Sequence, residues 1–504
     1  MSKLSRIFIS SALFSILSVS PVFAQEQQLS LTLRDGVLKV LENNLDISIE
    51  RISPEIEGSR IQREKGAYDP ELFGSFKRED ATTPLSARGS IAAGGITATE
   101  SETYSFSAGV EGKLPIGTQY TLEVKDNWTA ETLNRFEFEY ESFTGVKITQ
   151  PLLKDYGTAS NNLQINLAGK NRDISIYQLK QRIIDIVTEY GFAYWDLVRA
   201  KEELGLREDT KRLAEALLDI NRKKLEAGTI SQLEVTLAEA AAATRLDDVI
   251  VARKNVKDRE NAIKILITKD IYSLKDTVIL PSGEGAIRPS TESFDESIKK
   301  AIAGRPDYLE VKSQIEKSNI QIKYASNQTF PKIDLEASYG YNGLGTSFRN
   351  SFDNIDSNPQ WSLGVVFRYP LGNNTAKGDL RVARLEADQS ILKLKRLEQQ
   401  IILNVDNALK DINADRSRLE AARVSAKLSE DSLAAEEKKL AAGRSTTYNV
   451  LKVQEDLAKA KLNEINSIAD FNKSLIRYHK EKGSLLEELD ITLKDFPKTG
   501  EVYR

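Results

Sequence analysis

The chain has 504 residues, of which 29% are charged and 40% hydrophobic, and its formal net charge at pH 7 is -4. Lysine and arginine are interspersed with aspartate and glutamate, so the sequence lacks the basic footprint of nucleic-acid binding and predicts no nucleic-acid partner. Cysteine is absent, which excludes disulfides and lipidation at an N-terminal cysteine.

No motif in the sequence carries recognisable catalytic or metal chemistry. We find no phosphate-binding glycine loop and no nucleophile motif, so we predict no catalytic residue, no enzyme activity, no cofactor and no metal site. The one histidine, His479, lies among Arg477, Lys480 and Lys482, which predicts a position on a solvated helix surface.

The N-terminus has the order of a secretory signal peptide. Lys3 and Arg6 precede an apolar run over residues 7–19, and small residues lead to Ala24 before polar sequence begins. This run is too short to span a bilayer, so we predict a signal peptide over residues 1–24 with cleavage after Ala24. The rest of the chain has no apolar stretch of about 18 residues and predicts no transmembrane helix.

Two opening helices are predicted, over about residues 32–67 and 293–329. Thr32 and Ser293 each stand three residues before an acidic residue, which is the spacing of a capping box at a helix N-terminus. Each helix ends just before a proline that opens β-type sequence, so the duplication extends into the following strands.

Strand-like alternation follows each opening helix. In the second repeat, residues 333–342 and 361–369 carry apolar side chains on one face and polar side chains on the other. The first repeat has weaker outer strands over residues 71–78 and 143–150, with an added hairpin between them over residues 104–124. Strands of about ten residues suit a transmembrane barrel with a wet inner face, and ordinary half-buried sandwich strands are the alternative.

Two proline-free tracts with helical spacing predict a duplicated, very long helical hairpin. One lies between Pro151 and Pro281, and the other between Pro370 and Pro497. Each breaks once, at a matching phrase that ends in Gly228 in the first tract and in Gly443 in the second. Glycine lets the chain turn, so these residues mark the hairpin tips.

The first arms of the hairpins, Leu152–Ala227 and Leu371–Ala442, would be rods of about 115 and 110 Å. An apolar stripe with steps of four and three follows the first arm, and we interpret it as ordinary helix packing. The stripe consists of Leu179, Ile183, Ile186, Tyr190, Ala193 and Leu197.

The strand count predicts an assembly of several copies. A bilayer accepts sheet only as a closed barrel, and single-chain barrels need about eight strands or more. One chain offers about four to six strands, so three copies would supply about 12, or about 18 if the added hairpin joins. The helical rods would then surround a common axis and prolong the pore beyond the membrane.

Short phrases recur in order across both repeats. They are Leu31-Thr32-Leu33, Glu42-Asn43-Asn44, Tyr68-Asp69-Pro70, Gln150-Pro151-Leu152-Leu153, Gly304-Arg305-Pro306-Asp307, Phe330-Pro331-Lys332-Ile333 and Ala442-Gly443. With them the chain resembles the TolC-type outer-membrane efflux proteins over about Leu31–Glu488. The resemblance implies a membrane α+β fold: a duplicated strand/long-helix repeat that forms a trimeric outer-membrane β-barrel, continued by a periplasmic α-helical coiled-coil barrel.

The resemblance also implies a function and partners. The protein would be a homotrimer in outer-membrane lipid that extends into the periplasm and serves as the exit duct of a tripartite efflux or type I secretion system. Its protein partners would be a periplasmic adaptor and an inner-membrane pump. Two alternatives remain, a barrel-anchored trimeric structural or adhesin protein and a soluble periplasmic helical module with sandwich strands.

The predicted boundaries follow the duplication. They are the signal peptide 1–24, the first repeat 25–280, a linker 281–293, the second repeat 294–490 and a C-terminal tail 491–504. The sequence around the linker, from about residue 270, either wraps the middle of the tunnel or is disordered.

The resemblance places adaptor docking and channel opening at the hairpin tips, Gly228 and Gly443. In the resembled family two aspartates, six and nine residues after the second tip glycine, line the narrowest point of the channel. Asn449 and Lys452 occupy those positions here, so an acidic constriction at these two positions is absent. Glu455 and Asp456 are nearby acidic candidates for the constriction, and the sequence leaves open which of them faces the lumen.

A network that closes the tips is also implied by the resemblance. The family's acidic member of this network falls on Glu234, whereas its tyrosine and arginine positions hold Leu440 and Ser445. Arg444 and Tyr448 are candidates to substitute for the missing partners.

Overall fold

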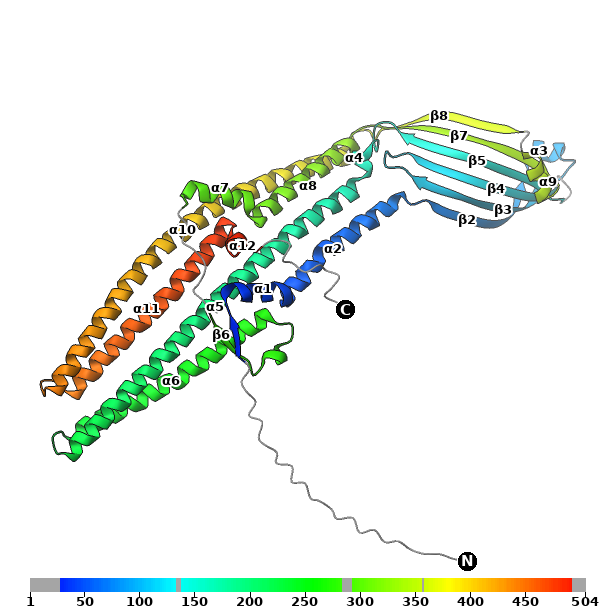
Figure 1. The fold of residues 1–504 in the computed structure, drawn as a ribbon. Helices are drawn as coiled ribbons and strands as arrows, with labels where there is room; N and C mark the ends of the chain where they lie inside the picture. Colours follow the sequence, from blue (N-terminus) through cyan, green and yellow to red (C-terminus); the bar gives the residue numbers. More distant parts are fainter. Residues whose placement is uncertain (1–27, 133–136, 283–291, 356–357, 492–504) are drawn as a thin grey trace, which may run out of the picture.

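The structure is a computed structural model that describes residues 28–132, 137–282, 292–355 and 358–491. A six-stranded sheet forms one end of the molecule, and the turns of two long helical hairpins lie at the opposite end (Figure 1). The predicted signal peptide lies outside the described residues, as do most of the predicted linker and of the C-terminal tail.

Each repeat passes from opening helices through strands into a helical hairpin. The elements of the first repeat are β1 (Gln28–Leu31), α1 (Leu33–Asn43), α2 (Leu45–Lys65), η1 (Gly66–Tyr68), β2 (Glu71–Pro84), α3 (Ala87–Ala92), β3 (Ala98–Lys113), β4 (Gln119–Glu131), β5 (Glu139–Pro151), α4 (Thr158–Asn161), α5 (Leu163–Glu226), α6 (Gln232–Ile267), η3 (Ile271–Leu274) and β6 (Val278–Pro281). The elements of the second repeat are α7 (Phe294–Gly304), α8 (Pro306–Gln328), β7 (Lys332–Gly345), α9 (Phe348–Asp353), β8 (Pro359–Arg368), α10 (Asn374–Ala441), α11 (Thr447–Lys482) and α12 (Leu485–Glu488).

The opening helices begin where the sequence predicts, but each is broken once. The Thr32 hydroxyl accepts a hydrogen bond from the backbone N–H of Asp35, and Ser293 forms the full capping box with Glu296. The prediction of one continuous helix was wrong in both repeats. Asn44 is extended and its side chain starts α2 as a new N-cap, whereas Arg305 is extended because it precedes a proline.

The two long arms are shorter than predicted at the ends that adjoin the sheet. The first rod begins at Leu163 instead of Leu152, because Asp155 and Gly157 adopt left-handed backbone angles, with φ of 64° and 86°. The second begins at Asn374 instead of Leu371, after Gly372 and Asn373 with φ of 91° and 46°. At these turns the chain changes direction between the strand and the long helix. The spacing of prolines in the sequence did not predict them.

The six strands form one antiparallel sheet in the order β2-β3-β4-β5-β7-β8. All of the predicted strands are present, and the added hairpin, β3 and β4, is part of the same sheet. β2 and β5 extend beyond the predicted residues 71–78 and 143–150. The sheet pairs the two repeats directly, since β5 of the first repeat is bonded to β7 of the second.

The main core lies midway along the helices. The predicted apolar stripe of α5 contributes Ile186, Tyr190 and Leu197, which pack with α1, α6, β6 and α11. Four of the six stripe residues are buried, and Leu179 and Ala193 pack against the same core at partial exposure. The interpretation of the stripe as helix packing is therefore confirmed.

His479 lies inside this middle region and not on a solvated surface, so that prediction was wrong. The residue is 1% exposed, its Nδ1 lies 3.1 Å from the Ser484 hydroxyl, and its ring contacts Tyr478 edge-on. The chain turns at Gly483, with φ of 76°, and folds α12 back toward the core. The neighbouring lysines and arginine gave no indication of this covering turn.

The part of the predicted linker region that the structure describes packs against the long helices. β6 pairs in parallel with β1, and Ile279 of β6 is 1% exposed within the main core. Lys201 of α5 donates a hydrogen bond to the carbonyl oxygen of Ile279 at 2.5 Å. The sequence up to Pro281 therefore lies along the middle of the helical part, beside α5 (Figure 1).

Candidate functional site

The two faces of the sheet differ in chemistry. On β4, one face carries Tyr120, Leu122, Val124, Trp128 and Ala130, and the other carries Gln119, Thr121, Glu123, Lys125 and Asn127. The strand register continues this division across the sheet, because directly paired residues lie on the same face. One face of the sheet is therefore mainly apolar, with Asp126 as a buried exception, and the other is mainly polar and charged.

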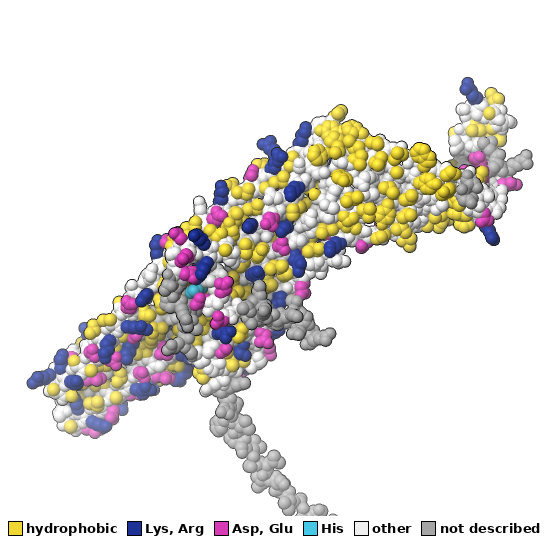
Figure 2. Space-filling view, turned by 45° about the horizontal axis from the view of Figure 1, so that its top comes forward, with side chains coloured by type: hydrophobic (Ala, Val, Ile, Leu, Met, Phe, Trp, Pro, Cys, Tyr) yellow, Lys and Arg dark blue, Asp and Glu magenta, His cyan; other side chains and the backbone are white. Residues whose placement is uncertain are grey.

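The apolar face is largely uncovered within the protomer. Leu72 and Phe76 on β2 are 81% and 65% exposed, and Trp361 and Leu363 on β8 are 71% and 66% exposed. Figure 2 shows hydrophobic side chains gathered over the strand-bearing part, with the charged side chains mainly over the helices. A large uncovered apolar surface of this kind marks contact with lipid or protein.

On β4 the apolar face has an aromatic residue near each end. Towards the end farther from the helices, Phe76, Tyr104, Trp128 and Tyr140 form a row of ring contacts across four strands, with centroids 5.5 to 5.9 Å apart for the pairs that involve Trp128. Tyr120 lies at the helical end of β4, eight residues before Trp128, or about 26 Å along the strand. An apolar band of about 25 Å between two aromatic girdles is typical of an outer-membrane β-barrel.

The sheet is open at both edges. Within the described part of the chain, β2 pairs only with β3 and β8 pairs only with β7. Among the described residues, no helix is long and apolar enough to cross a membrane. The same residues contain no cluster of three or more His, Cys, Asp or Glu side chains that could hold a metal ion.

The hairpin tips form at the two predicted glycines. Gly228 and Gly443 have φ of 69° and 70°, which other residues rarely adopt. The N–H of Thr229 donates to the Lys224 carbonyl, and that of Arg444 donates to the Lys439 carbonyl, which closes both helix ends in the same way. A Cβ added to either glycine meets no atom within 4 Å, so only the backbone angle requires glycine there.

The constriction candidates all lie on exposed sides of α11. Val450, Gln454 and Leu457 face the protomer and are buried, and Lys452 lies between the first two, roughly opposite their side of the helix. Asn449 and Asp456 share one flank of the exposed surface, and Glu455 lies on the other.

The charges of these candidates differ in how far they are compensated. Glu455 forms a salt bridge with Lys459 at 2.6 Å, which lowers the pKa of its carboxyl group. Within the described residues no salt bridge involves Lys452. The exposed surface of α11 thus carries Lys452 at its centre without a salt bridge, although its charge also helps to lower the pKa of Glu455.

The structure does not bring together the three residues predicted to close the tips. Arg444 and Tyr448 are exposed, and no hydrogen bond or ion pair joins either of them to Glu234 in the described protomer. One carboxylate oxygen of Glu234, Oε2, is buried without a hydrogen-bond partner among the described residues. Instead, Ser445 donates to Glu436, and this bond and the adjacent Lys439 lower the pKa of Glu436.

A buried asparagine that the sequence reasoning missed connects the two hairpins. Asn221 on α5 is 2% exposed, and its side-chain amide donates to the hydroxyl of Thr447 at 3.1 Å and to the carbonyl oxygen of Glu234 at 3.3 Å. These contacts join α5, α6 and α11 just behind the tips. The signal available in the sequence was that Asn221, a polar residue, occupies a position at which the helical spacing of α5 would place an apolar one.

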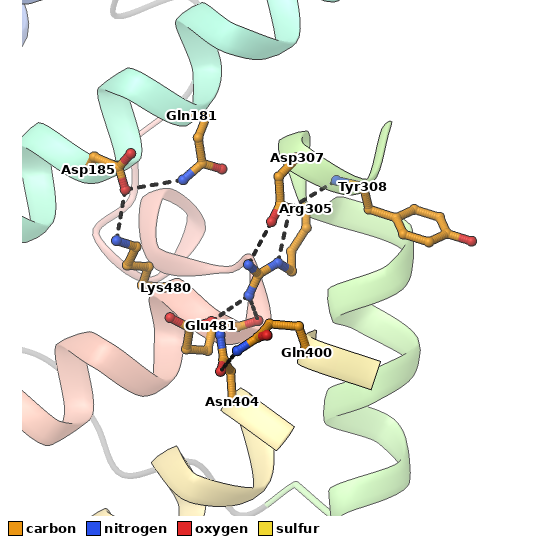
Figure 3. A network of polar contacts seen from close by, with 9 residues as sticks. All are labelled: Gln181, Asp185, Arg305, Asp307, Tyr308, Gln400, Asn404, Lys480 and Glu481. Atoms are coloured by element: carbon orange, nitrogen blue, oxygen red, sulfur yellow. Dashed lines mark hydrogen bonds and ion pairs between the residues drawn. The ribbon is translucent and has the colours of Figure 1, made fainter. Parts of the chain in front are cut away.

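A second missed group is the charged network around Arg305 (Figure 3). The guanidinium donates to both carboxylate oxygens of Asp307, at 3.1 and 2.8 Å, and to the Glu481 carboxylate at 2.6 Å. Asn404 of α10 donates to the same Glu481 oxygen at 3.1 Å. The network joins the break between α7 and α8 to the end of α11 and to α10.

We expect Arg305→Lys to destabilise the protein by about 1–3 kcal/mol, because an ammonium group cannot make the forked contact with Asp307 while reaching Glu481. Thermal unfolding of the purified protein measures the loss. Arg182→Lys is the matched control, since Arg182 pairs with Asp46 while 45% exposed, and it should change stability by less than about 0.5 kcal/mol. Equal melting of both variants and the wild type would contradict a structural role for the network.

The fold defines a class of protein: an outer-membrane channel protein in which strands alternate with long helical hairpins. The family model described as "Outer membrane efflux protein" matches residues 119–268 and 297–477, which together exceed half of the chain. The chain belongs to the outer membrane efflux protein family. It is therefore an outer-membrane protein whose helical part extends into the periplasm, as its resemblance to TolC-type proteins predicted.

Relatives and solved structures agree with this assignment. The outer membrane efflux protein BepC of Brucella suis is 23% identical over 461 residues, covering 89% of this chain and 84% of that protein. The outer membrane protein TolC of Escherichia coli is 22% identical over 68% of this chain and 69% of its own length. The CmeC outer membrane channel of Campylobacter jejuni shares the fold with a TM-score of 0.64 at 15% identity, covering 97% and 99% of the two chains.

Proposed function

We propose that the protein is the exit duct of a tripartite efflux or type I secretion system. It would provide a passive path from an inner-membrane pump across the periplasm and the outer membrane, with transport and not catalysis as its role. The observation that supports this best is the continuity of one sheet with two long hairpins. A sheet with a charged inner face leads directly into helices, as expected for a single water-filled conduit.

The duct would be a homotrimer. Six strands with two open edges cannot close a barrel alone, and three copies would supply about 18 strands. In this arrangement β2 of one copy pairs with β8 of the next. The strands of the added hairpin belong to the sheet, which supports the larger of the two predicted barrels.

We expect the mature protein to run as a trimer in detergent, with about three times the mass of one chain. Light scattering of the purified protein, corrected for bound detergent, measures this mass. A stable water-soluble monomer would contradict the proposal and favour the sandwich-strand alternative.

The domain assignment accompanies this proposal. Cleavage after Ala24 would release a mature chain with its first repeat at 25–280 and its second at 294–490, separated by the linker 281–293 and followed by the tail 491–504. The efflux family match includes strands and helices of both repeats, which favours the duct over the adhesin alternative.

The hairpin tips would receive the periplasmic adaptor. They are the end of the molecule farthest from the membrane sheet, and Asn221 ties the two hairpins together just behind them. The absence of native cysteine makes a direct test possible, since a single cysteine at Thr229 or Ala442 is the only reactive thiol. Crosslinking in intact cells should then capture an adaptor, whereas a cysteine at the outer end of the sheet should not.

We expect Gly228→Val combined with Gly443→Val to reduce export several-fold while the trimer still inserts into the outer membrane. A β-branched residue at φ near 70° strains each turn by at least about 1–2 kcal/mol, and no neighbouring atom adds a clash. Accumulation of a fluorescent efflux substrate in cells provides the measurement.

Gly205→Val supplies the control for these tip substitutions. Gly205 lies within α5 at ordinary helical angles, and a Cβ there also meets no atom within 4 Å. Wild-type export by the tip variant would show that the tips do not take part in docking or opening.

A further inference from the structure

The short helix α9, in the connection between β7 and β8, lies directly on the apolar face of the sheet. Gly343 and Gly345 allow this close approach. A Cβ on Gly343 would lie 1.9 Å from the Ser351 carbonyl oxygen, and a Cβ on Gly345 would lie 2.5 Å from the Ser351 nitrogen. By strand alternation these glycines share the face that carries Tyr339 and Tyr341. The helix is therefore on the side of the sheet that faces lipid.

A carboxyl group holds α9 in this position. Asp126 on β4 points into the apolar face, yet it is 0% exposed. The Ser142 hydroxyl donates to its Oδ1 at 2.7 Å, and the Ser351 hydroxyl of α9 lies 3.4 Å from the same oxygen. The two serine hydroxyls also bond to each other. If α9 moved away, a carboxyl group would face hydrocarbon at a cost of a few kcal/mol, so α9 is expected to stay in place.

The exposed surface of α9 combines aromatic and basic groups. Phe348 and Phe352 are one helical turn apart with ring centroids at 4.8 Å, and Phe348 is 52% exposed. The Arg349 side chain is 90% exposed and lies 3.8 Å from the Asp353 carboxylate, a weak contact. Figure 1 places α9 near the end of the sheet away from the helices. Its contact with Gly345, which the register aligns with Tyr140 and Trp128, puts it at the level of the aromatic row.

We propose that α9 is a membrane-interface element that binds the outer leaflet of the outer membrane. Phe348 and Phe352 enter the edge of the hydrocarbon layer, and Arg349 binds the phosphate groups of the lipid headgroups. The occupant is lipid because α9 lies on the same face of the sheet as the exposed apolar side chains, and because Phe348 on it is itself exposed. Aromatic residues with a basic neighbour suit the boundary between hydrocarbon and anionic headgroups. This inference depends on the membrane location and is independent of the export role.

The first test uses the absence of native cysteine. A nitroxide is attached to Phe348→Cys, and its collisions with oxygen and with a water-soluble nickel chelate are measured in the trimer reconstituted into phospholipid vesicles. Leu363→Cys on the apolar face and Ser362→Cys on the opposite face are the matched controls. We expect the Phe348 label to favour oxygen several-fold, as the Leu363 label does.

Two results would overturn the proposal. Nickel accessibility equal to that of the Ser362 label would place the phenylalanine in water. A label shielded from both reagents would instead place it against a neighbouring copy of the chain.

The second test concerns Arg349. The heat resistance of the wild-type trimer is compared in vesicles of phosphatidylcholine alone and with phosphatidylglycerol, whose phosphate carries a net negative charge. We expect the anionic lipid to raise the melting temperature of the wild type, and Arg349→Gln to remove most of that gain. Arg212→Gln, an exposed arginine on the distant α5 rod, should retain it. An unchanged gain in Arg349→Gln would contradict headgroup binding.

Discussion

Replacing Lys452 with aspartate is expected to make the channel several-fold more selective for cations. Lys452 lies at the centre of the exposed surface of α11, near the hairpin tip, and in the proposed trimer it would be repeated three times around the axis. Like charges that face a narrow pore repel ions of their own sign in a field that water only partly screens. Because the substitution inverts that charge in every copy, its effect should exceed that of any neighbouring neutral change.

Reversal potentials across a salt gradient in planar bilayers measure this selectivity. The measurement should be made at about 0.1 M salt, where the Debye length is about 10 Å and charges that line the pore still act on passing ions. Lys299→Asp is the matched control, because it makes the same charge change at an exposed position on α7, far from the tips. An unchanged reversal potential in Lys452→Asp would mean that Lys452 does not line the conducting path.

The acidic neighbours of Lys452 refine this prediction. Glu455 is paired with Lys459, so its charge is partly balanced on the same helix, whereas no such salt bridge holds Asp456 in the described protomer. Asp456 lies on the same flank of α11 as Asn449. If the flank of α11 that carries Asn449 faces the lumen, Asp456→Asn should therefore reduce cation selectivity more than Glu455→Gln does. A larger reduction in Glu455→Gln would mean that the flank with Glu455 faces the lumen.

The substitution Gly36→Ala is expected to cause the largest loss of stability, about 3 kcal/mol, through overpacking. A Cβ on Gly36 would lie 1.5 Å from the Tyr190 hydroxyl oxygen and 2.1 Å from the adjacent ring carbon. Tyr190 is 0% exposed within the main core, so its ring cannot withdraw without displacing α5 or its neighbours. The heat resistance of the purified trimer and its yield from membranes should both fall.

Two further variants test whether the loss of stability comes from the clash with Tyr190 and not from any change at this contact. Burial raises the pKa of the Tyr190 hydroxyl, and that hydroxyl has no hydrogen-bond partner among the described residues. Tyr190→Phe should therefore change stability by less than about 1 kcal/mol. The double variant Gly36→Ala with Tyr190→Leu should recover part of the loss. Wild-type melting of Gly36→Ala alone would contradict the close packing of α1 on α5.

Features that depend on neighbouring residues in the chain were predictable from the sequence. The tips at Gly228 and Gly443 follow from a helical period that stops at glycine, and the caps at Thr32 and Ser293 follow from local hydrogen bonding. The alternation of β7 and β8 identified the two faces of the sheet, because strand side chains point to opposite sides in turn. These elements carry their structural preferences within a few residues.

Features that depend on distant parts of the chain were decided by the tertiary structure. The helix break at Asn44 coincides with a hydrogen bond from its side chain to Leu266, 222 residues away. His479 is buried because α12 folds back over it, although its neighbours in sequence are charged.

The candidate site also has some features that the sequence predicted and others that only the tertiary structure decided. The sequence located the tips and the exposed helix that carries Lys452, but it placed Glu234, Arg444 and Tyr448 in a network that the protomer does not form. The contacts that do join the helices, from Asn221 to Thr447 and from Arg305 to Glu481, connect residues 226 and 176 positions apart. Periodicity and capping determine which segments are helix or strand, whereas burial and pairing of single polar groups depend on which segments meet, and only the folded chain decides that.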